Sequence, residues 1–110
     1  MKKNRDTIFL HHIFDASDKI IGYLEGRTFE NFIKQDMFFD ALVRELEIIG
    51  EAANNLSEDF QGEHPDIPWE RIIGMRNQLI HGYFTLDLQI VWDTLQKDVP
   101  KLKEQIKKLI

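Results

Sequence analysis

The chain has 110 residues, of which 43% are hydrophobic and 30% are charged; this length and composition fit one globular domain and argue against a disordered or two-domain chain. It contains no cysteine, which excludes disulfides, thiolate nucleophiles and cysteine-bound metals. The formal net charge is −5, whereas strong nucleic-acid binders usually carry a broad basic face, so any nucleic-acid binding must be confined to a local patch.

The charge is distributed unevenly along the sequence. Residues 36–70 carry ten acidic side chains against Arg44 alone, a net charge of −9. Residues 71–110 carry seven basic and four acidic side chains, a net charge of +3. The acidic middle segment is the feature that fits RNA binding least.

No segment is typical of a membrane span or a signal peptide. No stretch approaches the roughly 20 apolar residues that a membrane-spanning helix needs. The basic start of the chain is followed by an apolar stretch that His11 and His12 interrupt, whereas a signal peptide needs a longer apolar run. We therefore expect a cytoplasmic protein without membrane contact.

The spacing of apolar residues predicts an all-α fold. A first helix follows a +3/+4 rhythm from Leu10 to Leu24 and ends at Gly26, because glycine readily terminates a helix. Thr28 is a plausible cap for a short helical turn that ends near Phe32.

Two further helices are expected between residues 36 and 82, with a loop between them. Asp36 is a plausible N-cap for a helix that continues to Leu56. The segment 57–68 is expected to be a loop, with Pro68 in the first turn of the next helix, which ends at Gly82.

The last helix is expected from about Leu86 to the end of the chain, with a kink or a break at Pro100, because proline lacks the N–H that an α-helix uses. Short connections favour an up-and-down bundle of four to five helices in a single domain over residues 1–110.

The residues that could carry chemistry lie in the string MRNQLIHGYF, residues 75–84. Arg76 lies within the apolar stripe of its helix, where an unpaired charge would cost about 3–5 kcal/mol. Asn77 and His81 share another face, so Asn77 can hydrogen-bond the imidazole and fix its tautomer. Arg76 and His81 point roughly 140° apart on an ideal helix, so a site made across a two-fold axis would combine them better than one chain.

The same residues also have purely structural interpretations. His81 before Gly82 is a common helix ending, with a cationic side chain near the negative end of the helix dipole. Arg76 could be a core arginine paired with Glu47 or Glu51, which are themselves four residues apart. Tyr83 could be a packing aromatic with an exposed hydroxyl.

The motif R-x-x-x-x-H-x-Y formed by Arg76, His81 and Tyr83 resembles the signature of HepT-like proteins in the HEPN (higher eukaryotes and prokaryotes nucleotide-binding) superfamily. The strings IIGEAANNLS at 48–57 and IPWERIIGMRN at 67–77 are also similar to that family. The resemblance covers most of the chain, and length, helix order and motif position all agree.

This resemblance implies a metal-independent endoribonuclease toxin without a cofactor, silenced by a small nucleotidyltransferase antitoxin. It implies Arg76 and His81 as the catalytic pair, with Asn77 as a supporting residue, to which we add Glu51 as a partner for Arg76. Tyr83 would receive AMP from the antitoxin. The family dimerises through the motif helix, so we expect a homodimer or a higher even-numbered oligomer. The RNA substrate could be a transfer or a messenger RNA.

The implied chemistry suits these residue types. RNA supplies its own nucleophile, the 2′-hydroxyl, so the enzyme needs proton transfer and phosphate stabilisation. Histidine side chains titrate near neutral pH, so His81 can accept or deliver the proton, an effect worth ~10²–10⁴-fold. The forked guanidinium of Arg76 can stabilise the charge on phosphorus.

Other interpretations stay open at this point. A non-catalytic HEPN module could bind a nucleotide or a partner protein through the same groove, and a plain dimerising bundle is a third possibility. A metal site is disfavoured because His11 and His12 are adjacent and point about 100° apart on a helix. Glu47 and Glu51 could hold a cation, but a solvated or arginine-paired acidic face explains them better.

Overall fold

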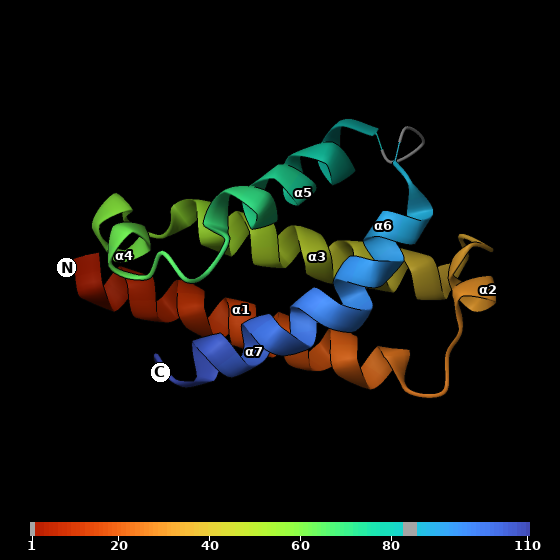
Figure 1. The fold of residues 1–110 in the computed structure, drawn as a ribbon, viewed down its shortest axis with the longest axis horizontal. Helices are drawn as coiled ribbons and strands as arrows, with labels where there is room; N and C mark the ends of the chain where they lie inside the picture. The colour runs from red at the N-terminus through yellow and green to blue at the C-terminus, as the bar shows by residue number, and fades with distance from the viewer. Residues whose placement is uncertain (1, 83–85) are drawn as a thin grey trace.

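The computed structural model describes residues 2–82 and 86–110, with side chains described from Arg5 onward (Figure 1). All regular structure in these two ranges is helical, which confirms the predicted all-α class. The α-helices in chain order are α1 (Lys2–Leu24), α2 (Phe29–Phe32), α3 (Met37–Asn55), α4 (Glu58–Glu63), α5 (Trp69–Gly82), α6 (Leu88–Asp93) and α7 (Val99–Lys107). None of them is long and apolar enough to cross a membrane.

The predicted helix caps are present. The hydroxyl of Thr28 accepts a hydrogen bond from the backbone N–H of Asn31 at 3.3 Å, which caps α2. A carboxylate oxygen of Asp36 accepts from the backbone N–H of Phe38 at 3.1 Å and caps α3. Gly26 follows α1 with φ 71°, a conformation that glycine adopts without strain.

The prediction of a loop over 57–68 is wrong in its first half, because residues 58–63 form α4. The hydroxyl of Ser57 accepts from the N–H of Phe60 at 3.1 Å and caps this helix. Two buried carboxylate oxygens of Asp6 in turn accept from the N–H and the hydroxyl of Ser57, at 2.8 and 2.7 Å. This clamp connects the start of α1 to the start of α4.

The C-terminal helix begins at Leu88, two residues later than predicted, and Asp87 caps it. It is divided as expected near Pro100: a π-helical segment, η2 (Thr94–Asp98), separates α6 from α7. Because Pro100 has no N–H to donate to the carbonyl of Gln96, a wider turn forms, in which the N–H of Val99 reaches back to Thr94.

The core lies where α1, α3 and α7 meet, and α5 packs on α3 (Figure 1). An aromatic cluster joins the short helix α2 to this core: the ring centroid of Phe32 lies 4.9 Å from that of Phe39 and 5.3 Å from that of Trp92. The fully buried aliphatic side chains include Ile13, Ile20, Leu42, Leu79, Leu95 and Ile106.

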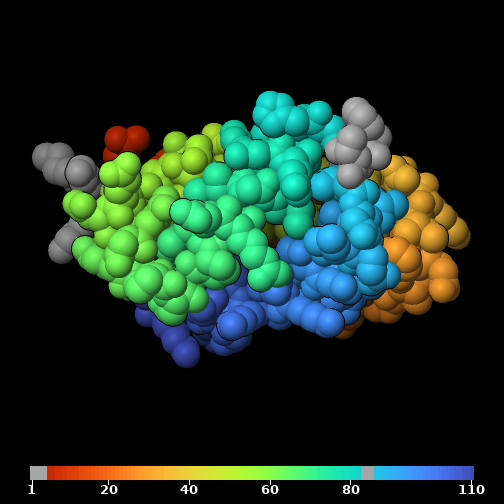
Figure 2. Space-filling view, turned by 45° about the horizontal axis from the view of Figure 1, so that its top comes forward, coloured from red at the N-terminus to blue at the C-terminus, as the bar shows by residue number. Residues whose placement is uncertain are grey.

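A hollow separates α5 from the C-terminal helix, as Figure 2 shows. It has a volume of about 110 Å³, and Leu46 and Ile49 of α3 lie among the residues that line it. At its rim the guanidinium of Arg71 pairs with Asp98 at 2.6 Å. The position of α5 therefore depends mainly on its packing against α3.

The two helices α3 and α5 approach closely at Gly50. A Cβ atom added to Gly50 would lie 2.1 Å from Cβ and 2.7 Å from Cγ of Arg76, distances that non-bonded carbon atoms do not tolerate. Gly50 therefore permits the stem of Arg76 to lie directly on the backbone of α3.

We predict that Gly50→Ala lowers the free energy of unfolding by about 1–3 kcal/mol, because α5 must move away from α3 to accommodate the methyl group. Gly22→Ala is the matched control, since a Cβ there would meet no atom within 4 Å; it should stabilise α1 slightly. Urea denaturation of both variants tests this, and equal stability of the two would contradict the close approach.

Candidate functional site

Arg76 lies on the face of α5 that packs against α3, as its position in the apolar stripe predicts. Leu79 on this stripe is fully buried and Ile72 is half-buried. Ile80, which the spacing assigns to the same stripe, is 51% exposed, because it lies at the edge of the contact between the helices. The Arg76 side chain itself is 23% exposed, and its Nε is buried without a hydrogen-bond partner among the described residues.

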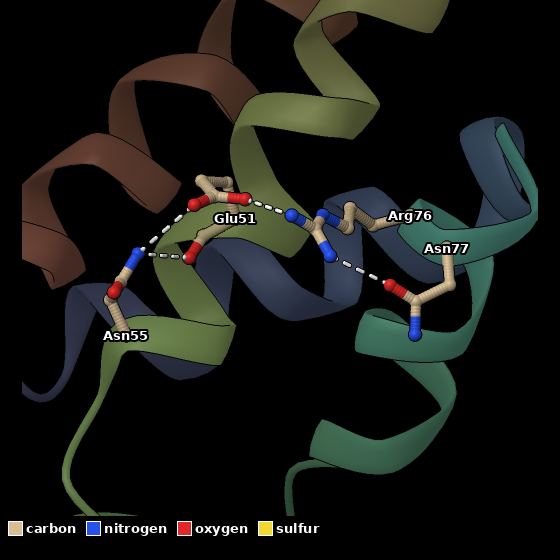
Figure 3. A network of polar contacts seen from close by, with 4 residues as sticks. All are labelled: Glu51, Asn55, Arg76 and Asn77. Atoms are coloured by element: carbon tan, nitrogen blue, oxygen red, sulfur yellow. Dashed lines mark hydrogen bonds and ion pairs between the residues drawn. The ribbon is translucent and has the colours of Figure 1, made fainter. Parts of the chain in front are cut away.

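The guanidinium of Arg76 is the centre of a polar network between α3 and α5 (Figure 3). Its Nη2 pairs with Oε2 of Glu51 at 2.5 Å, and its Nη1 donates to Oδ1 of Asn77 at 2.7 Å. Asn55 donates to Oε1 of the same Glu51 carboxylate at 3.4 Å and to the Glu51 backbone carbonyl at 2.9 Å. The structure thus selects Glu51 rather than Glu47 as the partner of Arg76.

The structure does not bring His81 into this network. His81 lies on the exposed side of α5, five residues beyond Arg76. Asn77 is expected from the sequence to hydrogen-bond the imidazole of His81. In the structure its carboxamide oxygen accepts a hydrogen bond from Arg76. Within one chain, therefore, Arg76, Asn77 and Glu51 form one group and His81 lies apart from it.

The end of α5 is as predicted at Gly82, whose φ of 143° favours glycine. Tyr83, the residue expected to receive AMP, lies outside the described residues. No group of three or more possible metal ligands of the His, Cys, Asp or Glu type occurs within residues 2–82 and 86–110.

A surface groove of about 280 Å³ adjoins the polar network. Its floor is the outer side of α3, and α1 and α5 form its walls. Its lining combines aromatic, aliphatic and charged side chains: Phe9, His12, Arg44, Glu47, Ile48, Glu51, Ala52, Asn55 and Ile80.

Sequence reasoning did not single out several members of this groove and network, among them Phe9 and Asn55. Phe9 carries no motif and follows the apolar pattern of α1. The 51–55 spacing on one helix is a pattern that could have indicated the contact of Asn55 with Glu51, since residues four apart are neighbours on a helix surface.

Comparison with known proteins assigns the family. The sequence model of the ribonuclease HepT-like family matches residues 13–109. A protein of Caldanaerobacter subterraneus subsp. tengcongensis named "Putative RNase" is 41% identical over 102 residues, which cover 93% of this chain and 91% of that protein. "Probable ribonuclease HepT" of Thermococcus cleftensis is 40% identical over 101 residues, or 92% of both chains.

A Methanocaldococcus jannaschii protein, also named "Putative RNase", is 36% identical over 106 residues, covering 96% of this chain and 97% of the relative. No solved structure is significantly similar to the chain. The family match spans most of the sequence, and the relatives match it over nearly their whole length. The chain therefore belongs to the ribonuclease HepT-like family.

Proposed function

We propose that this protein is a metal-independent endoribonuclease, the toxin of a toxin–antitoxin pair, and that Arg76 and His81 are its catalytic residues. The observation that carries the proposal is the partly exposed side chain of Arg76, whose guanidinium is held between Glu51 and Asn77 in a chain whose relatives bear ribonuclease names. An arginine oriented in this way offers N–H donors to the oxygens of a phosphodiester.

In the proposed reaction the 2′-oxygen of RNA attacks phosphorus and the bond from phosphorus to the 5′-oxygen breaks. The 2′-hydroxyl loses its proton and the departing 5′-oxygen gains one, and His81 takes part in this proton transfer. Arg76 stabilises the negative charge on the equatorial phosphate oxygens. The products are a 2′,3′-cyclic phosphate and a 5′-hydroxyl, and no metal ion is required.

The separation of Arg76 and His81 on one helix supports a site shared between two chains. Five helical residues turn the side chains roughly 140° apart. Gly74 lies on the same side of α5 as His81, and a Cβ there would meet no atom of its own chain within 4 Å, so a second α5 could approach closely. Each chain of such a dimer would supply Arg76 to one half-site and His81 to the other.

We expect light scattering at micromolar concentration to give twice the chain mass of 13.0 kDa, or a higher even multiple. Gly74→Leu should shift the protein toward the monomer, because a large side chain would block the approach of a second α5. Gly22→Leu on α1 is the control, since that site also has free space. A wild-type monomer throughout this range would contradict the shared site.

We expect His81→Ala to abolish RNA cleavage and Arg76→Lys to reduce it strongly, because lysine keeps the charge but not the forked donor geometry. The matched controls are His11→Ala, an exposed histidine on α1, and Arg71→Lys on the same helix as Arg76; both should cleave as the wild type does. EDTA should have no effect.

Circular dichroism of each variant is the control for correct folding. Equal cleavage by the wild type and a folded His81→Ala protein would overturn the nuclease assignment. Absence of cleavage by the wild type would favour the alternative, a HEPN module that binds a nucleotide or a partner protein without catalysis.

Control of the toxin is proposed to act through Tyr83, one residue beyond the end of α5. Transfer of AMP to its hydroxyl by a nucleotidyltransferase antitoxin would place bulk and a negative phosphate near the catalytic motif. This phosphate would repel RNA and compete for the same arginine. The toxin would thus be silenced by the type of group that it normally binds.

Mass spectrometry of the intact chain after co-expression with the proposed nucleotidyltransferase antitoxin should show a gain of one or more AMP units, lost in Tyr83→Phe. Tyr83→Phe should retain much of the cleavage activity and escape silencing. The chain has only two tyrosines, so Tyr23→Phe is the complete control and should be modified as the wild type is. A neutralised but unmodified chain would instead indicate inhibition by binding alone.

A further inference from the structure

We propose that the groove on the outer side of α3 is a nucleobase subsite, which selects a base with an exocyclic amino group next to the scissile phosphate. The inference rests on the proposed ribonuclease function and specifies the substrate of that site. Its basis is a group of aromatic, aliphatic and carboxylate side chains that adjoins the Arg76 network.

The groove and the phosphate-binding arginine share one residue. Glu51 lines the groove and also pairs with Nη2 of Arg76 at 2.5 Å. Asn55, which hydrogen-bonds Glu51, is a second residue common to the network and the groove. A phosphate on Arg76 would therefore place the neighbouring nucleotide at the open end of the groove.

The walls of the groove suit the flat faces of a base. On the α1 side, the rings of Phe9 and His12 meet edge to face, with centroids 5.9 Å apart. On the α5 side, Ile80 is 51% exposed. Aromatic and aliphatic surfaces of this kind bind unstacked bases.

The charges along the groove suit a neutral base better than a phosphate. The carboxylates of Glu47 and Glu51 and the basic side chain of Arg44 line the same groove. The ion pairs formed by the described residues do not include Glu47 or Arg44, so the Glu47 carboxylate is available as an acceptor. Carboxylates repel phosphates but accept hydrogen bonds from the amino groups of cytosine, adenine and guanine, which uracil lacks.

The size of the groove fits this assignment. Pockets for drug-sized ligands hold about 300–1,000 Å³, and the groove of about 280 Å³ lies just below that range. It has room for one base. We therefore assign it to a single base beside the cleaved bond.

The experiment is cleavage of a fully randomised RNA library, with the 5′-hydroxyl ends sequenced. For the wild type we expect one of the two positions next to the cut to favour amino-bearing bases over uracil by about tenfold or more. Glu47→Gln should reduce this preference to about twofold, whereas Phe9→Leu should lower kcat/KM for all bases and leave the preference unchanged.

Matched controls separate these effects from general damage. Glu63→Gln changes an exposed carboxylate on α4, and Phe14→Leu changes a half-buried ring on α1 that lies beneath the ammonium group of Lys103 rather than in the groove. Both should cleave with wild-type preference. No base preference in the wild type, or the same preference in wild type and Glu47→Gln, would overturn the subsite and leave the ribonuclease function intact.

A binding experiment distinguishes an error in the proposed base subsite from an error in the proposed nuclease activity. A randomised 2′-O-methyl library cannot be cleaved, and the fraction that the protein retains should show the same base preference even if the protein has no nuclease activity. Glu47→Gln should reduce this preference in binding as it does in cleavage. Light scattering tests whether the groove is instead an interface between copies of the chain. If Phe9→Leu or Glu47→Gln changes the molar mass while the base preference stays as in the wild type, the groove is such an interface and the proposal is overturned.

Discussion

The close approach of α5 to α3 at Gly50 is the constraint on which the rest of the site depends. With only hydrogen on its Cα, Gly50 lets the first carbons of the Arg76 side chain lie on the α3 backbone. The guanidinium then emerges at the edge of the contact, within reach of Glu51 on one helix and Asn77 on the other. A wider separation of the helices would break the first of these interactions while leaving both helices intact.

Glu51 connects two neighbouring regions of the surface. It holds the guanidinium of Arg76 and lines the groove between α1 and α5. Its own position is fixed from the next helical turn, where Asn55 donates to the Glu51 side chain and backbone. A movement of this carboxylate would change both the orientation of the arginine and the shape of the groove, so the two regions are expected to respond to substrate together.

Local sequence patterns predicted the helices and their caps, because Thr28, Asp36 and Gly82 act on backbone groups a few residues away. They failed for α4, whose cap Ser57 is held by Asp6, 51 positions earlier in the chain. The same distinction between local patterns and long-range packing applies to the candidate site. The position of Arg76 followed from helical periodicity, but the choice of Glu51 as its partner and the assembly of the groove depend on how three helices pack.

The ion pair of Arg76 with Glu51 has a consequence for the effect of salt on anion binding. Binding to an unpaired surface arginine neutralises a phosphate and releases counterions from the nucleic acid, so affinity falls as salt rises. Here a phosphate bound to Arg76 would lie beside the Glu51 carboxylate, which repels it and competes for the same guanidinium, and salt weakens this opposing effect as well. The two effects oppose each other. An acidic protein with this arrangement would hold an anion with modest affinity, and over a wide range of ionic strength that affinity would change little.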